Sequence, residues 1–472
     1  MIGRKVEKQA LLRAYNSKES QFVAVYGRRR VGKTYLVRKT FDNAFAFYHT
    51  GVFDGGYREQ LDEFRESLEE YGLADCPHLN NWRDAFRELR RLLESKTEKR
   101  KIVFIDELPW METRNSNFVG QVDKFWNKWA SAREDIVFIV CGSAASWMIK
   151  NIINDYGGLH NRITDSISVK PFSLKECEDY AGELGLSMSR RELAETYMVF
   201  GGVPYYWSFL ESSESLAQNL DRLLFAADGK LRNEFNRLFK SLFRNDRMYR
   251  ETIEILGRRK AGKTREEILS EASFSDGGKF SECLRALEEC GFIRSFVEIG
   301  KTSKGTMFQL IDNFTLFHLE FLSGRIKTGE RYWTTSVTSP EVSGWKGRAF
   351  ERLCLQHIRE IKAALGIAGV RTNVNSWFHV PDERCNTGVQ IDLLIDRADG
   401  VINLCEMKYS EGGYDLTSAE VKKLITRRDV FIKTTGTSKS IHLTMVTPEG
   451  VISSANAHGI QSQITLSDLF LL

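Results

Sequence analysis

The stretch Gln21–Thr34, with the sequence QFVAVYGRRRVGKT, decides the fold of the N-terminal part of the chain. Its first six residues, Gln21–Tyr26, are mostly apolar and predict a buried strand that ends at the first glycine. The residues that follow, Tyr35–Phe41, predict a helix, so the glycines mark a strand-to-helix turn. Such turns are typical of a layered α/β domain, in which apolar strands alternate with amphipathic helices.

The turn matches the pattern GxxxxGKT in full. Glycines let the backbone wrap around a phosphate, so that successive amide hydrogens and the helix N-terminus face the anion. Lys33 is expected to reach the β- and γ-phosphates of a nucleotide, and the Thr34 hydroxyl to bind Mg²⁺. A glycine-containing turn that matches by chance is the alternative. The predicted nucleotide-binding residues of the loop are Gly27, Arg28, Arg29, Arg30, Val31, Gly32, Lys33 and Thr34.

A second motif supports the same site. The segment Lys101–Glu107, KIVFIDE, is an apolar strand that ends in two carboxylates. Its apolar residues predict a central strand, and ligands bind at the carboxyl ends of strands in open α/β sheets. Asp106 is therefore expected to join the Mg²⁺ shell, and Glu107 to polarise the attacking water.

Two further candidate residues follow the next predicted strand, Asp135–Gly142. Ser143 is expected either to contact the γ-phosphate or to cap the helix Ala144–Lys150. Arg162 is a candidate arginine finger that acts within the chain or across a subunit interface, with a solvated surface position as the alternative. The residues predicted to catalyse hydrolysis are Lys33, Glu107 and Arg162.

These residues resemble the AAA-related, archaeal-type P-loop ATPases that are common in prokaryotes. The resemblance covers about the first half of the chain. It rests on Ile2-Gly3-Arg4-Lys5-x-Glu7, GRRRVGKT, FIDELPW, CGSAASWM and GGVPYY, the last at Gly201–Tyr206. The resemblance implies ATP as the nucleotide and a helical lid after the ATPase core, and it does not indicate a cellular task.

Length and composition exclude several other classes of protein. The chain has 472 residues, of which 42% are hydrophobic and 28% charged, which predicts about three folded domains and excludes disorder as the main state. No uncharged apolar run approaches the ~18 residues that a membrane helix needs. The opening MIGRKVEKQALLRAY lacks the apolar region of a secretory signal. We therefore expect a cytoplasmic protein without a membrane partner.

Net charge and the spacing of the cysteines bear on whether the protein binds nucleic acid, zinc or disulfide partners. The chain has 67 basic and 63 acidic residues, a formal net charge of +4, so binding to nucleic acid requires local basic patches. The eight cysteines form no CxxC pair, and the histidines form no HExxH array. This spacing favours reduced, mostly buried thiols over a zinc site or a disulfide framework.

The pattern of apolar residues divides the chain into five parts. Residues 1–170 predict the ATPase core, and residues 171–243 predict an almost wholly helical lid. Residues 244–325 predict several helices followed by two short strands. Residues 326–344 are polar and aperiodic and predict a linker, and residues 345–472 predict a mixed α/β domain.

A second match to GxxxxGKT, Gly257–Thr264, is not expected to bind a nucleotide. The preceding Tyr249–Leu256 is charged and has a helical period, and Thr264–Glu267 forms a capping box that starts the next helix. We interpret the match as a turn between two helices of a winged helix-turn-helix. Gly278–Cys290 is then the recognition helix, and Gly300–Gly305 lies in the wing.

Basic residues in this segment can contact DNA phosphates. They are nearly balanced by acidic residues, so a winged helix that contacts only protein is an equal alternative. The two clusters consist of Arg258, Arg259, Lys260 and Lys263, and of Lys301 and Lys304.

The C-terminal part contains two predicted strands with acidic residues. Asp392 lies inside the apolar run VQIDLLI, and the second strand, VINLCEMK, ends in Glu406-Met-Lys408. If the strands pair as a hairpin, Asp392 and Glu406 can face one another. Lys408 then projects on the same side as Glu406, because side chains two positions apart in a strand share a face.

Two carboxylates and a lysine in this arrangement can bind a divalent cation and activate water against a phosphodiester. Glu351, on the predicted helix Trp345–Leu365, is expected to complete a metal site with Asp392 and Glu406, and Lys408 is the candidate catalytic lysine. The pattern resembles the PD-(D/E)XK nuclease fold, which implies a restriction-endonuclease-like domain of about 130 residues. A nucleic-acid-binding relic without activity and a plain structural hairpin are the alternatives.

The sequence therefore predicts a multidomain α/β protein with a P-loop core, a helical lid, a winged helix and a nuclease-like domain. The expected function is ATP hydrolysis with Mg²⁺ that drives action on DNA. One alternative is a STAND-like regulatory switch without nuclease activity, and another is a chaperone-like remodeller whose C-terminal domain docks a protein. A homo-oligomer or a protein partner is compatible with each of these hypotheses.

Overall fold

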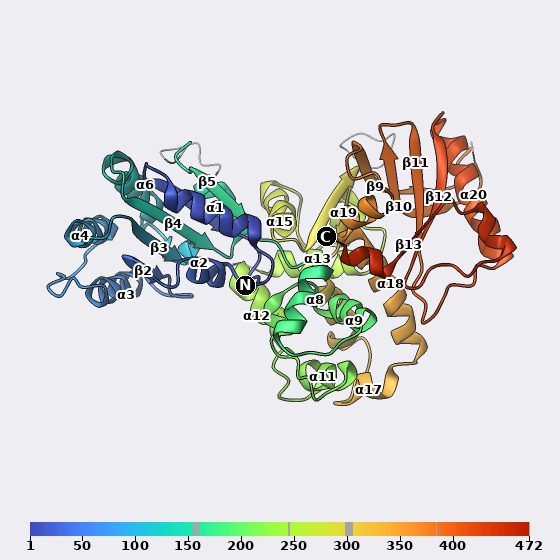
Figure 1. Cartoon of the computed structure of the whole chain (residues 1–472), viewed down its shortest axis with the longest axis horizontal. Helices are drawn as coiled ribbons and strands as arrows, with labels where there is room; N and C mark the ends of the chain where they lie inside the picture. The colour runs from blue at the N-terminus through green and yellow to red at the C-terminus, as the bar shows by residue number, and fades with distance from the viewer. Residues whose placement is uncertain (154–158, 160, 244–245, 298–304, 384, 472) are drawn as a thin grey trace. The chain divides into compact units, whose positions relative to one another are not determined.

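The computed structural model describes residues 1–471 except 154–158, 160, 244–245, 298–304 and 384. The chain forms two compact units, which Figure 1 colours in chain order. The first unit comprises residues 1–171 and 238–244, and the second comprises residues 172–237 and 245–472. Within the described part of the chain, no helix combines the length and the apolar character needed to cross a membrane.

The first unit is built on a five-stranded parallel sheet with the strand order β2-β3-β4-β1-β5. The strands are β1 (Gln21–Tyr26), β2 (Phe47–Thr50), β3 (Lys101–Asp106), β4 (Ile136–Gly142) and β5 (Asp165–Ser168). Every residue of β3 and β4 is buried, as expected for strands covered on both faces. The sequence predictions of β1 and β3 are confirmed, and the predicted strand Asp135–Gly142 is one residue longer than β4.

Helices cover both faces of this sheet. On one face, α1 (Lys5–Asn16) and α2 (Lys33–Thr40) pack against alternate residues of the strands, such as Val23 and Phe104. On the other face, the intervening residues, such as Phe22 and Phe138, pack against three helices. These are α3 (Tyr57–Glu70), α4 (Trp82–Ser95) and α6 (Phe118–Lys128). The result is a three-layer α/β domain whose strands all end at one edge.

Short helices follow the carboxyl ends of the strands, close to the predicted nucleotide site. They are α5 (Leu108–Met111) after β3, and α7 (Ala145–Met148) and η2 (Ile149–Ile153) after β4, whereas η1 (Ala130–Ala132) connects α6 to the start of β4. The side chain of Ser143 does not cap α7. Of the two roles that the sequence left open for Ser143, helix capping is therefore not observed.

The second unit begins with a group of helices. They are α8 (Leu174–Glu183), α9 (Arg190–Phe200), α10 (Pro204–Trp207), α11 (Leu216–Leu220) and η3 (Asp221–Phe225). Helix α12 (Glu234–Leu242) follows them, and its residues from 238 on belong to the first unit. Serines form capping boxes at the starts of α8, α9 and α11, which supplies partners for otherwise unpaired amide hydrogens. The almost wholly helical character predicted for residues 171–243 is confirmed.

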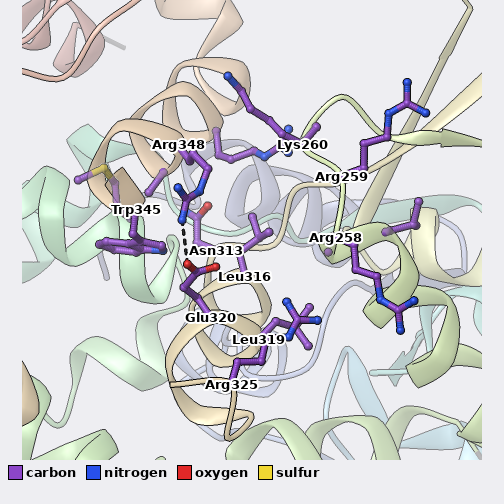
Figure 2. Close-up of a pocket in the computed structure, with 15 residues that line it drawn as sticks. Arg258, Arg259, Lys260, Asn313, Leu316, Leu319, Glu320, Arg325, Trp345 and Arg348 are labelled. Carbon is purple, nitrogen blue, oxygen red and sulfur yellow. Dashed lines mark hydrogen bonds and ion pairs between the residues drawn. The ribbon is translucent and has the colours of Figure 1, made fainter. Parts of the chain in front are cut away.

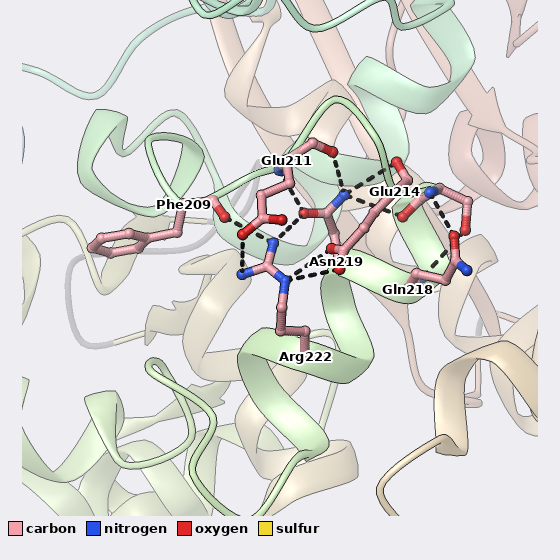
Figure 3. A network of polar contacts seen from close by, with 7 residues as sticks. Phe209, Glu211, Glu214, Gln218, Asn219 and Arg222 are labelled. Atoms are coloured by element: carbon pink, nitrogen blue, oxygen red, sulfur yellow. Dashed lines mark hydrogen bonds and ion pairs between the residues drawn. The ribbon is translucent and has the colours of Figure 1, made fainter.

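Arg222 organises the loop between α10 and α11. Its guanidinium donates hydrogen bonds to the Glu214 carboxylate at 2.9 Å, to the Asn219 side-chain oxygen at 2.7 Å and to the Phe209 carbonyl at 3.1 Å (Figure 3). One planar cation thus satisfies several acceptors that the loop could not pair by itself.

The next elements correspond to the segment predicted as a winged helix. They are α13 (Arg247–Gly257), β6 (Lys263–Thr264), α14 (Arg265–Glu271), α15 (Gly278–Glu289), β7 (Ile293–Val297) and β8 (Thr306–Leu310). The strands form an antiparallel sheet with the order β6-β8-β7. Of the predicted wing residues, Gly300, Lys301 and Lys304 lie outside the described residues.

The second GxxxxGKT match lies between the end of one helix and the start of the next. Helix α13 ends at Gly257, and Thr264 forms the expected capping box with Glu267. Gly262 has a φ of +86°, and a β-carbon there would meet the carbonyl oxygen of Phe308. This glycine therefore permits close approach of two backbones, and the match has no buried strand before it.

The segment predicted as a linker, residues 326–344, is folded. It contains α17 (Tyr332–Ser336) and the first residues of α18 (Pro340–Gln356). Trp333 is buried against the rings of Phe317, Phe321 and Trp345. The linker prediction was wrong because two buried side chains without a periodic pattern, Trp333 and Val342, and hydrogen bonds to the distant Asp221 hold the segment.

The helix predicted from Trp345 to Leu365 is two helices. Helix α18 starts earlier, at Pro340, and α19 (Ile358–Ala364) follows after a break at His357. His357 is buried, which lowers the pKa of its imidazole to about 4. The neutral ring bonds to the Leu353 carbonyl through Nδ1 at 2.8 Å and accepts the Leu174 amide hydrogen through Nε2 at 3.1 Å. The bond to the distant Leu174 explains the break.

A second five-stranded sheet, with the order β13-β12-β11-β10-β9, forms the core of the C-terminal region. Strands β9 (Thr372–His379), β10 (Val389–Arg397) and β11 (Val401–Met407) are antiparallel, whereas β11, β12 (Ser440–Thr447) and β13 (Ser462–Thr465) are parallel. Helix α20 (Ser418–Thr435) packs Leu424 and Phe431 against one face. The hairpin predicted for β10 and β11 is confirmed.

The packing of α17 generates a test of the folded segment. The buried Asp221 carboxylate accepts the amide hydrogens of Trp333 at 2.7 Å and Thr334 at 3.0 Å. Asp221→Ala leaves both donors without a partner, so we expect a loss of about 2 kcal/mol in the free energy of unfolding. Hydrogen exchange of a peptide that covers residues 332–336 should accelerate. Asp228→Ala, at an exposed position, is the control, and equal exchange in the two variants would contradict this account.

Candidate functional site

The loop between β1 and α2 has the backbone that the motif requires. Gly27 has a φ of +147°, and a β-carbon at this position would clash with the carbonyl oxygen of Val169. Gly32 has a φ of +90° and precedes the first residue of α2. Both positions need glycine, because other residues rarely adopt these conformations. The loop thus leads directly into a helix N-terminus, which is suited to an anion.

Lys33 and Thr34 connect this loop to the rest of the sheet edge. The ammonium of Lys33, which is 5% exposed, donates to the carbonyl oxygens of Gly27 and Arg28, both at 3.0 Å. The Thr34 hydroxyl donates to the Asp106 carboxylate at 2.6 Å. The structure therefore brings together the ammonium, hydroxyl and carboxylate that the sequence assigned to one site.

Glu107 is held beside Asp106 in a constrained conformation. Its φ is +47°, its amide donates to the Asp106 carboxylate at 2.9 Å, and its own carboxylate accepts from the Ser143 hydroxyl at 2.7 Å and amide at 3.2 Å. Burial raises the pKa of Glu107, against the opposing effect of the Lys33 charge. Ser143 thus orients Glu107, which is a role that the sequence did not predict.

The arginines of the loop lie in different surroundings. Arg28 is buried, and the guanidinium of Arg29 lies 5.7 Å from the Trp110 ring and 6.0 Å from the Phe53 ring. Arg30 has a φ of +72°. Within a nucleotide site, cations at these positions favour the approach of a polyphosphate.

Arg4 is a residue of this site that the sequence did not identify. Its guanidinium is buried and donates to the carbonyl oxygen of Val31 at 3.0 Å, across 27 residues of sequence. The only signal for it was its place in the opening motif Ile2-Gly3-Arg4-Lys5. The bond fixes the loop from the side of the N-terminal segment.

Arg162 is exposed, and its amide donates to the Leu159 carbonyl at 3.0 Å. Its role as an arginine finger stays a prediction.

A second group of functional candidates lies in the second unit. Lys260, in the loop after α13, forms ion pairs with Glu351 of α18 and, at 3.4 Å, with Asp392 of β10. Burial raises the pKa of Glu351 to about 7, and the charge of Asp392 acts in the same direction. Two of the predicted metal ligands are therefore close to one another, and they share the ammonium of Lys260.

The loop that carries Lys260 is held in place from both sides. The carbonyl oxygen of Lys260 accepts hydrogen bonds from Arg352 of α18 and Gln309 of β8, both at 2.7 Å. Lys260, Glu351 and Asp392 line a cavity of only about 10 Å³, which is close to the space that one water molecule needs. The ammonium thus nearly fills the gap between the carboxylates.

Asp392 occupies an irregular position of its strand. Ile391 pairs with Trp377 and Leu394 with Asn375, so β10 has one more residue than β9 in this interval. Such β-bulges redirect side chains and often lie next to functional sites. The Asp392 carboxylate also accepts a hydrogen bond from the Gln390 side chain at 2.7 Å.

The third predicted ligand, Glu406, is engaged elsewhere. One of its carboxylate oxygens pairs with Lys408 at 2.8 Å, and the other pairs with Arg427 of α20. Burial opposes the charge of Lys408, but the Glu406 carboxylate outweighs it and raises the pKa of the lysine. In the described part of the chain, no three His, Cys, Asp or Glu side chains are grouped so that they could hold a metal ion. The predicted set Glu351, Asp392 and Glu406 is therefore not assembled in this conformation.

Of the basic residues that the sequence assigned to DNA phosphates, the four that the structure describes, Arg258, Arg259, Lys260 and Lys263, have acidic partners. Arg258 pairs with Glu271 at 3.2 Å, Arg259 pairs with Glu267 at 2.6 Å, and Lys263 also pairs with Glu271. The composition of the segment showed nearly equal numbers of acidic and basic residues, but it could not show that these acidic side chains pair with these basic ones.

Comparison with protein families agrees with the first site. Residues 1–210 match the model of an ATPase domain found predominantly in Archaea. The match contains the loop, Asp106, Glu107 and Ser143. The chain therefore carries an ATPase domain, and ATP hydrolysis is its enzymatic activity.

Related proteins and solved structures add context. An uncharacterized protein of Methanocaldococcus jannaschii is 24% identical over 439 residues, which cover 92% of this chain and 91% of that protein. An uncharacterized ATP-binding protein of the same organism is 43% identical over 42 residues, which cover 9% of this chain and 71% of that protein.

Two solved structures are similar at lower identity. The Walker-type ATPase of Pyrococcus abyssi has a TM-score of 0.49 at 18% identity, covering 68% of this chain and 96% of that one. The Aeropyrum pernix ORC2 protein, solved with ADPNP and ADP, has a TM-score of 0.41 at 13% identity, covering 67% and 92%. At these scores neither likeness establishes the fold.

The environment of Glu107 generates a test of its role as a base. Glu107→Gln keeps the shape of the side chain and removes its charge, so ATP turnover should fall at least about 100-fold while nucleotide binding is retained. Because burial raises the pKa of the folded carboxyl, the charged form destabilises the fold at high pH. The variant should therefore unfold at a higher temperature than wild type at pH 8, with a smaller difference at pH 5.

The control for this test is Glu134→Gln, at an exposed position. It should change neither turnover nor the pH dependence of unfolding. Turnover by Glu107→Gln at the wild-type rate would exclude Glu107 as the base.

Proposed function

We propose that the protein is a Mg²⁺-dependent ATPase whose nucleotide cycle controls action of the second unit on DNA. The hydrogen bond between Thr34 and Asp106 carries the first half of this proposal. It places a hydroxyl and a carboxylate oxygen side by side at the end of a phosphate-binding loop. Mg²⁺ prefers such oxygen ligands and is usually shared with substrate phosphates, so these two side chains fit it.

In this proposal the chain's own residues act in a defined order. Lys33 leaves the two carbonyl oxygens of its loop and donates to the β- and γ-phosphates of ATP. Asp106 and Thr34 would hold Mg²⁺, which would supply positive charge against the phosphates. Glu107, oriented by Ser143, accepts a proton from the attacking water. Arg162 serves as the arginine finger, in the same chain or in a second copy.

The C-terminal region supports a second candidate function, metal-dependent cleavage of a phosphodiester. The supporting observation is that Glu351 and Asp392 hold one cation, the ammonium of Lys260, between them. A carboxylate pair that accommodates an ammonium also suits a divalent cation, which would activate water when bound. Lys408 lies beside Glu406 and can stabilise negative charge near the same strands. Glu406 would have to leave Arg427 to join them.

Lys260 links this candidate site to the segment predicted as a winged helix. While its ammonium pairs with both carboxylates, a metal ion must compete with a tethered positive charge. Binding of DNA to the predicted winged helix would remove that competition if it moved the loop after α13. A regulatory switch without strand cleavage remains the alternative function, in which the same contact only reports the nucleotide state.

The two GxxxxGKT matches provide a matched pair of variants for the ATPase. Lys33→Ala removes the only ammonium of the loop and should reduce ATP binding and turnover at least about 100-fold. Lys263→Ala removes the equivalent lysine of the second match and should leave both unchanged. Isothermal titration with Mg²⁺–ATP and a phosphate-release assay measure these effects. Normal turnover in Lys33→Ala would refute the proposed site.

The role of Lys260 is tested by metal binding and by plasmid cleavage. Lys260→Ala should bind Mn²⁺ at least about 10-fold more tightly than wild type, because a competing cation is removed, and Glu351→Gln in the same chain should cancel the gain. On the nuclease hypothesis, Lys260→Ala nicks supercoiled plasmid faster than wild type, and Asp392→Ala or Lys408→Ala abolishes nicking. Tighter Mn²⁺ binding without nicking would favour the switch, and unchanged Mn²⁺ binding would exclude competition by Lys260.

A further inference from the structure

A cavity in the described part of the second unit adjoins the group formed by Lys260, Glu351 and Asp392, because Lys260 and Arg352 contribute to its lining as well. Its volume is about 290 Å³, close to the lower limit of ~300 Å³ for small-molecule sites. Four segments line it (Figure 2). They are Met198 of α9, the end of α13 with the loop after it, α16 (Asn313–Phe317) and η5 (His318–Leu322) with Arg325 after them, and the middle of α18. Its apolar lining includes Leu256, Leu316, Leu319 and Trp345.

Positive charge dominates the polar lining of this cavity. The only acidic residue among the lining residues is Glu320, against six basic residues. The basic residues are Arg258, Arg259, Lys260, Arg325, Arg348 and Arg352. A cavity with one sign of charge and apolar walls concentrates ligands of the opposite charge.

Four of the six basic side chains have acidic partners: Arg348 pairs with Glu320 of the lining, and Arg258, Arg259 and Lys260 pair with carboxylates outside it. Arg348 pairs with Glu320 at 2.9 Å, but both side chains are substantially exposed, at 48% and 34%, and exposed pairs contribute little. Arg325 is exposed and has no ion pair with any described residue. Figure 2 shows Arg325 and Arg348 on either side of Glu320. Arg325 is therefore available to an incoming anion, and the exposed Arg348 can exchange Glu320 for an anion.

Arg352 adds a buried positive charge. It is 5% exposed, and its described hydrogen bond goes to a backbone carbonyl, that of Lys260. Burial lowers the pKa of Arg352 to about 10, while the nearby Glu351 and Asp392 oppose this effect. A buried guanidinium without a direct carboxylate partner is costly, and an anion in the adjoining cavity would compensate it.

We propose that this cavity binds the phosphate of a nucleotide. Guanidinium groups bind phosphate oxygens in a planar, bidentate manner, and the apolar wall with Trp345 suits the less polar part of the ligand. The volume exceeds what a bare phosphate fills. The ligand is either a free nucleotide or the phosphorylated end of a nucleic acid strand, because both present the same chemistry. This site is separate from the ATP site and does not depend on the proposed nuclease activity.

The experiment uses the full chain with Lys33→Ala, which removes nucleotide binding at the P-loop. Two fluorescent probes are titrated at 0.15 M salt: N-methylanthraniloyl-AMP, and a single-stranded 12-mer DNA with a 5′-phosphate. Arg325→Ala combined with Arg348→Ala should weaken binding of at least one probe 10-fold or more. The matched control, Arg359→Ala with Arg371→Ala, removes two exposed arginines elsewhere in the unit and should change binding less than 2-fold.

The probes distinguish the two sources of the phosphate. If the Arg325→Ala, Arg348→Ala variant loses binding of N-methylanthraniloyl-AMP, the ligand of the cavity is a free nucleotide. Loss of binding to the phosphorylated DNA, with weak binding of the same strand bearing a 5′-hydroxyl, identifies a strand end. Unfolding temperatures of the two double variants confirm that both are folded. The proposal is overturned if neither probe binds, or if the two double variants weaken binding equally, because only general electrostatic attraction would then remain.

Discussion

The hydrogen bond from the Thr34 hydroxyl to the Asp106 carboxylate is the interaction on which the ATPase site depends. Thr34 follows β1 and Asp106 ends β3, and β4 lies between these strands in the sheet. The bond can form because parallel strands all end at one edge, where the loops after β1, β3 and β4 meet. Ser143, after β4, joins the same edge through Glu107. Each contribution comes from a different strand, so no single segment carries the site.

Close packing of the loop sets the geometry of that edge. Gly27 lies against the backbone of Val169, and Arg4 holds Val31 from the N-terminal segment. These contacts fix the loop from two directions before any ligand is bound. A loop held in this way loses less conformational entropy on binding a triphosphate than a free loop would. The same edge also holds the Glu107 carboxylate in a buried position, and burial raises its pKa.

In the second unit, the loop after α13 connects otherwise separate elements. The Lys260 ammonium reaches Glu351 and Asp392, and its carbonyl accepts from Arg352 and Gln309. The same short loop lines the basic cavity. Because these groups are largely buried, a change in one of them alters the electrostatic environment of the others. This arrangement gives a physical route between the predicted winged helix and the C-terminal sheet.

The sequence by itself determined the local features of this protein. The strands β1 and β3, the phosphate loop, the capping box at Thr264 and the acidic hairpin all follow from short patterns of neighbouring residues. Tertiary structure decided what depends on partners far apart in the chain. Trp333 packs the segment predicted as a linker, His357 lies at the break between two helices, Ser143 hydrogen-bonds to Glu107, and Lys260 pairs with two of the predicted metal ligands. Periodicity and motifs report on residues within one element, whereas a buried charge or ring takes its role from whichever distant group satisfies it.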